Sequence, residues 1–208
     1  MKTSLTPVDA PSIRSRPVYA VLESRPASLH LIVADGEGAD AVVEMLDKAN
    51  DRSGMLAAAH VMYTPGPDGA DHGAALEAIG AAQFFRAPTI PSLLPRLQRV
   101  LLDAHMGTQF YLAGTEGLIG QAEREIMNTG FPHVAIQKEH RGSTVRRVQC
   151  VHCKGITENV ATDPFKCSHC GLNLFVRDHY SRRIAAFQGV NIDAEDPGKV
   201  PESVVRFK

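Results

Sequence analysis

The chain has 208 residues, enough for one sizeable domain and one small one. It carries 22 Lys and Arg against 23 Asp and Glu, four cysteines and no tryptophan. No stretch offers the roughly 20 uninterrupted apolar residues of a membrane helix, and the polar first 16 residues lack the apolar segment of a signal peptide. These features exclude a membrane-spanning segment and predict a cytoplasmic protein.

Residues 1–16 are predicted to form a flexible arm. From residue 17 to residue 140, apolar runs of strand length alternate with amphipathic helical patterns. This alternation predicts an α/β, Rossmann-like domain with a doubly wound parallel sheet covered by helices on both faces. The predicted strands cover residues 18–22, 29–34, 56–63, 83–86, 108–113 and 134–137, and the predicted helices cover 41–49, 74–82, 91–101 and 118–128.

Ligands of such domains bind beyond the carboxyl ends of the strands, where the strand order reverses. The loops 35–38, 64–69 and 114–117 are therefore candidates, and Gly36, Gly38, Gly114 and Gly117 are the candidate cofactor-binding residues. The glycines do not complete a dinucleotide fingerprint, and the chain has no Gly-Lys-Ser/Thr phosphate loop. Glu37 and Glu116 would repel a phosphate at a helix N-terminus. We therefore favour turns and helix caps over a nucleotide site.

The four cysteines form two Cys-x-x-Cys pairs, Cys150 with Cys153 and Cys167 with Cys170. Two such turns facing each other make a tetrahedral site of four sulfurs. Gly171 directly after the second pair fits a turn that needs a positive φ. The spacing predicts a metal-binding ribbon over residues 145–190 with these four cysteines as ligands, followed by an extended tail over 191–208. Two disulfides or four unrelated thiols are the alternatives.

The identity of the metal is open between zinc and a single iron of the rubredoxin kind, because both suit four sulfurs. The residues around the cysteines are polar, which favours a structural zinc site over a shielded redox iron. With the tetrahedron complete, the two histidines are expected in the solvated outer shell. The polar residues within the two cysteine pairs are His152, Ser168 and His169, and Lys154 and Lys166 flank the pairs.

Charge is unevenly distributed along the chain. Residues 1–137 hold ten Lys and Arg against fifteen Asp and Glu, whereas residues 138–183 hold nine against four. The basic ribbon either meets an anionic partner surface or is basic only because small ribbons have a large surface. Within it, Arg182 and Arg183 are candidates for binding carboxylates or phosphates.

Residues 109–120, with the helix and strand after them, resemble the end of the pyridine-nucleotide domain of ferredoxin–NADP reductase-type enzymes. That family has a Cys-Gly-Pro-type loop where this chain has Ala113, Gly114 and Thr115. The flavin-binding barrel of those reductases is also missing, because too few residues precede the sheet. The resemblance implies a degenerate, non-catalytic copy of the domain.

The sequence from Cys167 to Gly189, continuing through 193–195 and 201–202, resembles the C-terminal part of DmmA-type small subunits of bacterial dimethylamine monooxygenases. The resemblance covers about residues 145–203, and it implies a haem-dependent complex that N-demethylates a secondary amine with O2 and NADPH. It also implies three partners: a haem-containing catalytic subunit, a reductase subunit with flavin and an iron–sulfur cluster, and a tetrahydrofolate-binding subunit.

The chain itself shows no haem-ligand motif among its nine histidines, no flavin domain and no iron–sulfur spacing. We therefore expect no catalytic residues here and favour an accessory subunit of an oxidoreductase that organises its partners. The first alternative places iron in the ribbon as an electron relay. The second is a nucleic-acid-binding zinc ribbon, which the acidic α/β half and the lack of interleaved aromatic residues disfavour.

Overall fold

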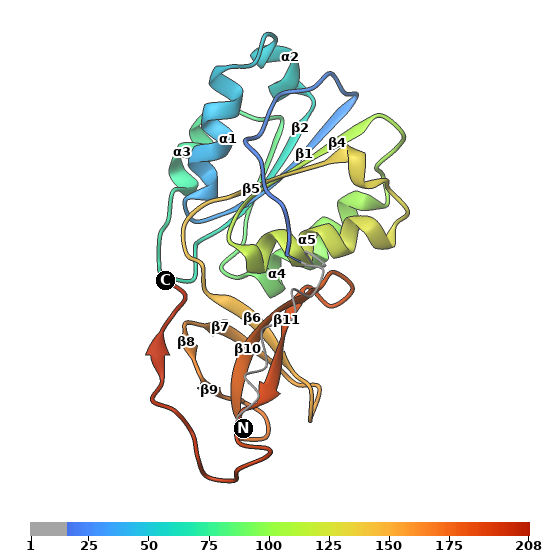
Figure 1. Ribbon diagram of the computed structural model, residues 1–208. Coiled ribbons are helices and arrows are strands. Elements are labelled where there is room, and N and C mark those ends of the chain that lie inside the picture. Colours follow the sequence, from blue (N-terminus) through green and yellow to red (C-terminus); the bar gives the residue numbers. More distant parts are fainter. Residues whose placement is uncertain (1–15) are drawn as a thin grey trace, which may run out of the picture.

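A computed structural model of the chain describes residues 16–208. The predicted flexible arm lies outside the described residues except for Arg16. Two bodies follow each other along the chain: an α/β domain and, beyond the carboxyl ends of its strands, a smaller ribbon (Figure 1). The predicted fold, a doubly wound parallel α/β sheet followed by a small four-cysteine ribbon, is confirmed.

The α/β domain is built on five parallel strands in the order β3-β2-β1-β4-β5. These are β1 (Leu29–Asp35), β2 (Ala59–Thr64), β3 (Gln83–Arg86), β4 (Thr108–Gly114) and β5 (Ile136–His140). The order reverses between β1 and β4, so the switch point lies at their carboxyl ends. Every residue of β2 is buried, as is typical of a parallel sheet covered on both faces.

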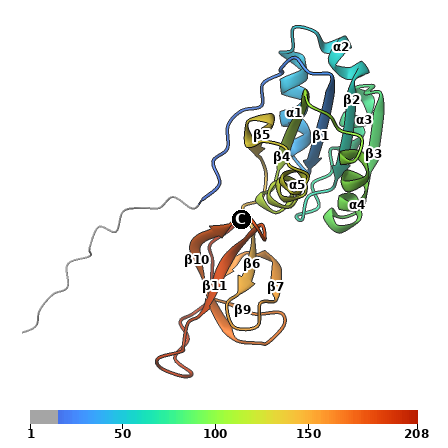
Figure 2. The ribbon, with the colours of Figure 1, turned by 90° about the vertical axis from the view of Figure 1, so that its right-hand side faces the viewer.

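Helices cover both faces of this sheet (Figure 2). On one face, α1 (Gly38–Asp47), α2 (Arg52–Ala57) and α3 (Gly73–Ala78) pack on Ile32, Tyr63 and Tyr111. On the other, α4 (Ile90–Leu101) and α5 (Glu116–Asn128) pack on Leu31 and Phe110. The alternation follows from the two-residue repeat of side chains along a strand. None of the helices among the described residues is long and apolar enough to cross a membrane.

Three predicted strands need correction. The strand predicted over 134–137 begins only at Ile136, because residues 133–135 form a 3-10 turn, and it continues to His140. Residues 18–22 run beside β5 without forming a strand: Ala20 N–H donates to the Lys138 carbonyl at 2.9 Å, but Leu22 N–H donates to the Glu139 carboxylate at 2.7 Å. A side chain therefore replaces the next backbone acceptor, and the ladder ends. The predicted strand 56–63 begins at residue 59, because Asp51 caps α2 by accepting from Gly54 N–H at 2.9 Å.

The ribbon consists mainly of a sheet in the order β7-β6-β11-β10-β9, antiparallel except for the parallel pair β6 and β11. Its strands are β6 (Arg146–Cys150), β7 (Ile156–Val160), β9 (Phe165–Lys166), β10 (Asn173–Ser181) and β11 (Ala186–Asn191). A short 3-10 turn, η1 (His133–Ala135), precedes β5. The turn of the β10–β11 hairpin carries Arg182 and Arg183, the candidates for binding carboxylates or phosphates.

The C-terminal tail returns to the ribbon. Strand β12 (Val204–Val205) pairs with β8 (Thr162–Asp163), and Phe207 is buried in the ribbon core. The Arg146 guanidinium lies between two rings, 4.0 Å from the centroid of Phe187 and 4.3 Å from that of Phe207. Stacking of a buried guanidinium on aromatic faces adds to the attraction between them. The last residues of the chain therefore complete the core of the ribbon.

The two bodies meet where the β10–β11 hairpin packs on α5. A Cβ atom added at Gly120 would lie 2.0 Å from the Tyr180 hydroxyl and 3.1 Å from the Ala185 side chain. Tyr19, from the N-terminal segment, donates to the Glu116 carboxylate of α5 at 3.0 Å beside the same junction. The junction therefore requires a residue without a side chain at position 120.

A carboxylate ties β1 to β4 at the switch point. Asp35 accepts from Thr115 N–H at 2.7 Å and from the Thr115 hydroxyl at 2.5 Å. Gly114 has a φ of +123°, and a Cβ atom there would lie 1.9 Å from the Asp35 carboxylate. Burial raises the pKa of Asp35 to about 6, although its bonds from Thr115 act in the opposite direction.

We expect Gly120→Ala to weaken the junction, because a methyl group overlaps the Tyr180 hydroxyl. Overpacking of this kind costs about 1–3 kcal/mol. Gly117→Ala is the matched control: it lies on the same helix, its nearest outside atom is 3.8 Å away, and alanine favours a helix by up to about 1 kcal/mol. Denaturant unfolding and limited proteolysis between the domains should separate the two variants. Equal stability would contradict the packing argument.

We expect the stability contribution of Asp35 to fall as pH rises from about 4 to about 6. The folded protein holds the Asp35 proton more tightly than the unfolded chain, whose carboxyl has the ordinary pKa of 3.8. Ionisation then costs on the order of 3 kcal/mol at neutral pH. Asp35→Asn should remove this pH dependence of the unfolding free energy, and any other effect of the substitution on stability should not change with pH. The measurement is the difference in unfolding free energy between variant and wild type at pH 4, 5, 6 and 7, and a difference that stays constant from pH 4 to pH 6 would contradict the raised pKa.

Candidate functional site

The two cysteine turns have the same backbone geometry. In the first, Cys150 N–H donates to the Gly155 carbonyl at 2.9 Å, and Lys154 N–H donates to the Cys150 carbonyl at 3.0 Å. In the second, Cys167 N–H donates to the Leu172 carbonyl at 2.9 Å, and Gly171 N–H donates to the Cys167 carbonyl at 3.0 Å. Lys154 and Gly171 occupy the same place in their turns, and both have a positive φ, 63° and 74°. The Gly171 prediction is met, and Lys154 adopts the same conformation without being glycine.

The turns bring the four cysteine sulfurs together. All four lie within 4.8 Å of one another, with the Cys150 and Cys170 sulfurs 3.9 Å apart and the Cys153 and Cys167 sulfurs 3.7 Å apart. These separations are far longer than the roughly 2.05 Å of a disulfide. Four ligands at the usual metal–sulfur distance of about 2.3 Å would lie about 3.8 Å apart in a tetrahedron. The four residues form a metal-binding site whose spacing fits one tetrahedral ion.

Hydrogen bonds prepare the Cys167 sulfur for a metal. Burial alone would raise the pKa of the Cys167 thiol, but N–H donors from Cys170 and His169, together with neighbouring thiols, lower it to about 6. The pKa of Cys170 moves the other way: Leu172 N–H lowers it, but burial and the bonds with the other three thiols outweigh this effect and raise the pKa to about 12. Gly155 N–H also points to the Cys153 sulfur at 3.4 Å. Backbone donors favour the thiolate, which is the form that binds metals. Cys150 and Cys167 are buried, whereas Cys153 and Cys170 lie at the surface.

The polar residues of the second turn attach it to the first hairpin. The His169 ring nitrogen Nε2 lies 2.9 Å from the Ile156 carbonyl, and the Ser168 and Thr157 hydroxyls lie 3.0 Å apart. A Cβ atom at Gly155 would lie 2.4 Å from the His169 ring, so the ring packs flat on the chain there. Of the two histidines expected in the solvated outer shell, His152 is exposed, and His169 is exposed but also bound to the neighbouring turn.

The candidate glycines of the α/β domain lie mostly in close-packed turns. A Cβ atom at Gly38 would lie 2.2 Å from the Ala113 carbonyl, and one at Gly36 would lie 3.1 Å from the Gly66 backbone. Gly114 makes room for Asp35. Gly117 lines a cavity. These positions let the loops 35–38, 64–69 and 114–117 meet at the switch point.

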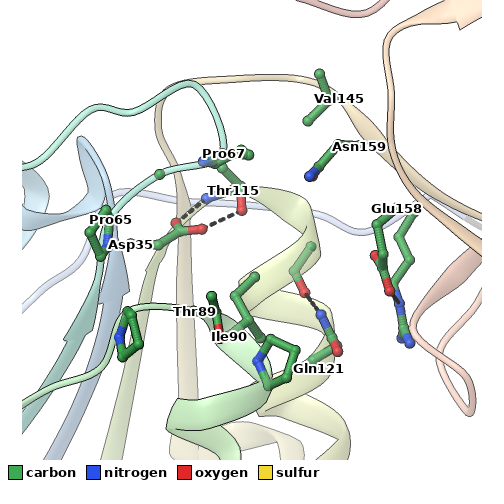
Figure 3. A pocket seen from close by; sticks show the side chains of 15 residues that line it. Asp35, Pro65, Pro67, Thr89, Ile90, Thr115, Gln121, Val145, Glu158 and Asn159 are labelled. Carbon is green, nitrogen blue, oxygen red and sulfur yellow. Dashed lines mark hydrogen bonds and ion pairs between the residues drawn. The ribbon is translucent and has the colours of Figure 1, made fainter.

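A cavity of about 380 Å³ opens where these loops face the ribbon. Figure 3 shows Asp35, Thr115 and Gln121 on the α/β side and Glu158 and Asn159 entering from the ribbon. Pro65, Pro67, Pro88, Pro91 and Ile90 supply apolar walls. No local pattern along the chain indicated the ribbon residues of this cavity, because their contribution depends on how the two bodies pack.

The cavity is poorly suited to a phosphate. The one cation among the described residues that line it, Arg147, donates to Glu158 at 2.8 Å and to the Ile184 carbonyl at 2.9 Å. Glu37 and Glu116 lie at the first turns of α1 and α5, where an anion would otherwise bind. The Thr115 hydroxyl bonded to Asp35 also caps α5 through Leu118 N–H. The arrangement is therefore that of a helix cap beside a polar hollow.

Solved structures with some likeness to the chain are multidomain oxidoreductases. One is phthalate dioxygenase reductase, 13% identical with a TM-score of 0.45, covering 68% of this chain and 47% of that one. Another is an intact type IV self-sufficient cytochrome P450 monooxygenase, 15% identical with a TM-score of 0.46, covering 82% of this chain and 28% of that one. The chain thus spans less than half the length of either solved protein.

A curated relative is the heme-dependent oxidative N-demethylase delta subunit of Ectopseudomonas mendocina (strain ymp). It is 27% identical over 146 residues, which cover 68% of this chain and 83% of the relative. Residues 11–136 match the family described as dimethylamine monooxygenase subunit DmmA-like, N-terminal domain, and residues 147–190 match its C-terminal domain. The two matches take in both the parallel sheet and the four-cysteine ribbon, and the chain therefore belongs to the dimethylamine monooxygenase subunit DmmA-like family.

Proposed function

We propose that the chain is an accessory, non-catalytic subunit of an NADPH- and O2-dependent oxidative N-demethylase that acts on dimethylamine. Its ribbon holds one structural zinc ion on Cys150, Cys153, Cys167 and Cys170. The observation that carries the proposal is the tetrahedral spacing of these sulfurs on two matching turns, in a chain of the DmmA-like family. Four cysteines leave no open position for a substrate, which is the mark of a structural rather than a catalytic zinc site.

The ion supplies folding free energy to the ribbon, because a four-thiolate site forms only when its ligands converge. The ribbon needs that contribution: among the described residues its apolar cluster has six buried members, and a second cluster consists of Leu174 with the ligand cysteines Cys150 and Cys167. The chain's own residues then present the assembled ribbon and the α/β domain to other subunits. Ligand cysteines kept reduced in this way also support a cytoplasmic location.

The catalytic cofactors belong to partners in this proposal. A haem-containing subunit carries out the oxidation, a reductase subunit with flavin and an iron–sulfur cluster takes electrons from NADPH, and a third subunit binds tetrahydrofolate. The name of the curated relative, a delta subunit of a heme-dependent N-demethylase, supports a complex of several subunits. The acids at the switch point disfavour phosphate groups, and this supports binding of NADPH by the reductase subunit rather than by this chain.

An alternative within the same complex places iron in the ribbon as a one-electron relay. The surface position of Cys153 and Cys170 favours it, because electrons could leave the site without crossing the protein interior. A rubredoxin-type site takes and passes single electrons. The polar residues around the turns favour zinc.

A nucleic-acid-binding ribbon is the candidate from a different class. Its basis is the nine Lys and Arg against four Asp and Glu in residues 138–183. The acidic α/β half beside it opposes a long polyanion.

We expect the chain purified anaerobically to contain one zinc ion and to be colourless. The measurement is metal content by mass spectrometry together with the visible spectrum. One iron ion with sulfur-to-iron charge-transfer bands would instead establish the relay.

We also expect the partner subunits to fail to form a stable active complex when this chain is omitted. Normal assembly and turnover without it would overturn the accessory role.

We expect Cys153→Ser and Cys167→Ser to lose the metal and the protease resistance of the ribbon while the α/β domain stays folded. The α/β domain has its own two buried clusters, one on each face of its sheet. Ser168→Ala is the control: it removes the hydroxyl contact with Thr157 but no sulfur, and it should keep the metal. Metal loss without any change in ribbon proteolysis would show that the ion does not support the fold.

A further inference from the structure

The ribbon uses all of its negative charges internally. Each acid of residues 138–183 takes part in an ion pair, and the pairs are Glu139 with Arg141, Glu158 with Arg147, Asp163 with Arg206, and Asp178 with Arg146. Five cations of the same stretch have no ion pair with any described residue: Lys154, Lys166, Arg177, Arg182 and Arg183. The net positive charge of the ribbon therefore lies on a few identifiable side chains.

Two of these cations flank the cysteine site. Four thiolates around a divalent ion carry a net negative charge, which Lys154 and Lys166 offset at the metal end of the ribbon. Arg177 stands alone on β10. Arg182 and Arg183 are adjacent and both exposed, and nothing among the described residues neutralises them. The concentrated, uncompensated charge is at the β10–β11 turn.

This turn is fixed by hydrogen bonds within the ribbon and packs on the α/β domain. Arg147 donates to the Ile184 carbonyl at 2.9 Å, and Ala185 N–H donates to the Arg182 carbonyl at 3.3 Å. Ala185 is buried with a φ of 52° and packs where Gly120 leaves space on α5. Figure 1 shows the turn directly below α5. Because the backbone is fixed, binding through the two arginines needs little ordering of the chain.

The neighbouring helix adds a third arginine. Arg124 follows Gly120 by one helical turn and therefore lies on the same side of α5. Its partner Glu125 is only 11% exposed and also accepts from Gln98 of α4 at 2.8 Å. Arg124 therefore has its charge paired, by Glu125 at 2.6 Å. We call the two unpaired residues, Arg182 and Arg183, the arginine face.

We propose that the arginine face is a docking surface for a carboxylate-rich patch on a partner subunit; this rests on the proposed function in a multi-subunit complex. Planar guanidinium groups bind carboxylates through paired hydrogen bonds. The face is a pair of adjacent arginines rather than a track of cations, and its turn offers no aromatic side chain on which bases could stack. Both features fit a protein surface better than a nucleic acid.

The test uses the full chain and the partner subunits of the complex, with binding measured by interferometry between 50 and 300 mM salt, roughly the range in which surface charges become screened. Arg182→Glu with Arg183→Glu should raise the dissociation constant at least about tenfold at low salt and remove most of its salt dependence. Lys48→Glu with Arg177→Glu makes the same change in net charge at two exposed cations that lie outside the face and lack ion pairs with described residues. That control should stay within about twofold of wild type. Metal content and circular dichroism confirm that each variant is folded.

The outcomes separate the two proposals. If the wild-type chain binds no partner subunit, the proposed function fails. If the wild type binds and the Arg182/Arg183 variant binds equally well, or the control weakens as much, the arginine face is not the docking surface. The Arg182/Arg183 variant could instead bind the partner subunits normally and lose only self-association, or lose only its binding to a single-stranded oligonucleotide used as a probe. Either result would overturn the proposal of an acidic protein partner.

Discussion

The ribbon depends on the convergence of four sulfurs within 4.8 Å. Its strands are short, β9 having two residues and β6 and β7 five each, and small cores seldom suffice without a further link. The two cysteine turns repeat one hydrogen-bond pattern, so each presents its sulfurs from the same side. The two turns also set where the strands of the ribbon lie: the first turn connects β6 to β7, and the second connects β9 to β10. A metal ion is the link that the geometry fits.

A second constraint fixes how the ribbon is attached. Arg146 stacks between Phe187 and Phe207 and forms an ion pair with Asp178 at 2.9 Å, and Asp178 also binds Arg16 at 2.8 Å. One buried guanidinium thus connects the ribbon core, the chain's last residues and the N-terminal segment that runs along β5. The Arg16 pair is exposed and adds little. The buried stacking does more, because a removed ring would leave one face of a buried guanidinium without its aromatic contact. The ribbon and the ends of the chain are therefore a single packing unit.

The sequence predicted the parts that local patterns control. The α/β rhythm, the buried Leu93, Leu97 and Leu101 stripe of α4 and the two cysteine turns all follow from spacing along the chain. It failed where a distant side chain decides. Residues 18–22 have strand-like composition, yet the Glu139 carboxylate takes the hydrogen bond that a strand partner would need. The switch-point cavity and the joint at Gly120 depend on which surfaces of the two bodies meet, and no local pattern encodes that.

The same separation of local and distant control explains the charge pattern. A net charge of −1 for the chain conceals an acidic sheet edge and a basic ribbon. At the switch point, Asp35 is used to join β1 to β4, and Glu37 and Glu116 stand at helix N-termini where acids are favoured by the helix dipole. These acids stabilise the domain, and by the same charge they disfavour the phosphate that such an edge commonly binds. The acids of residues 138–183 form ion pairs with arginines of the same chain. Positive charge therefore remains only where the structure leaves it unpaired, and opposite charges at separate places orient a protein as it approaches its partner.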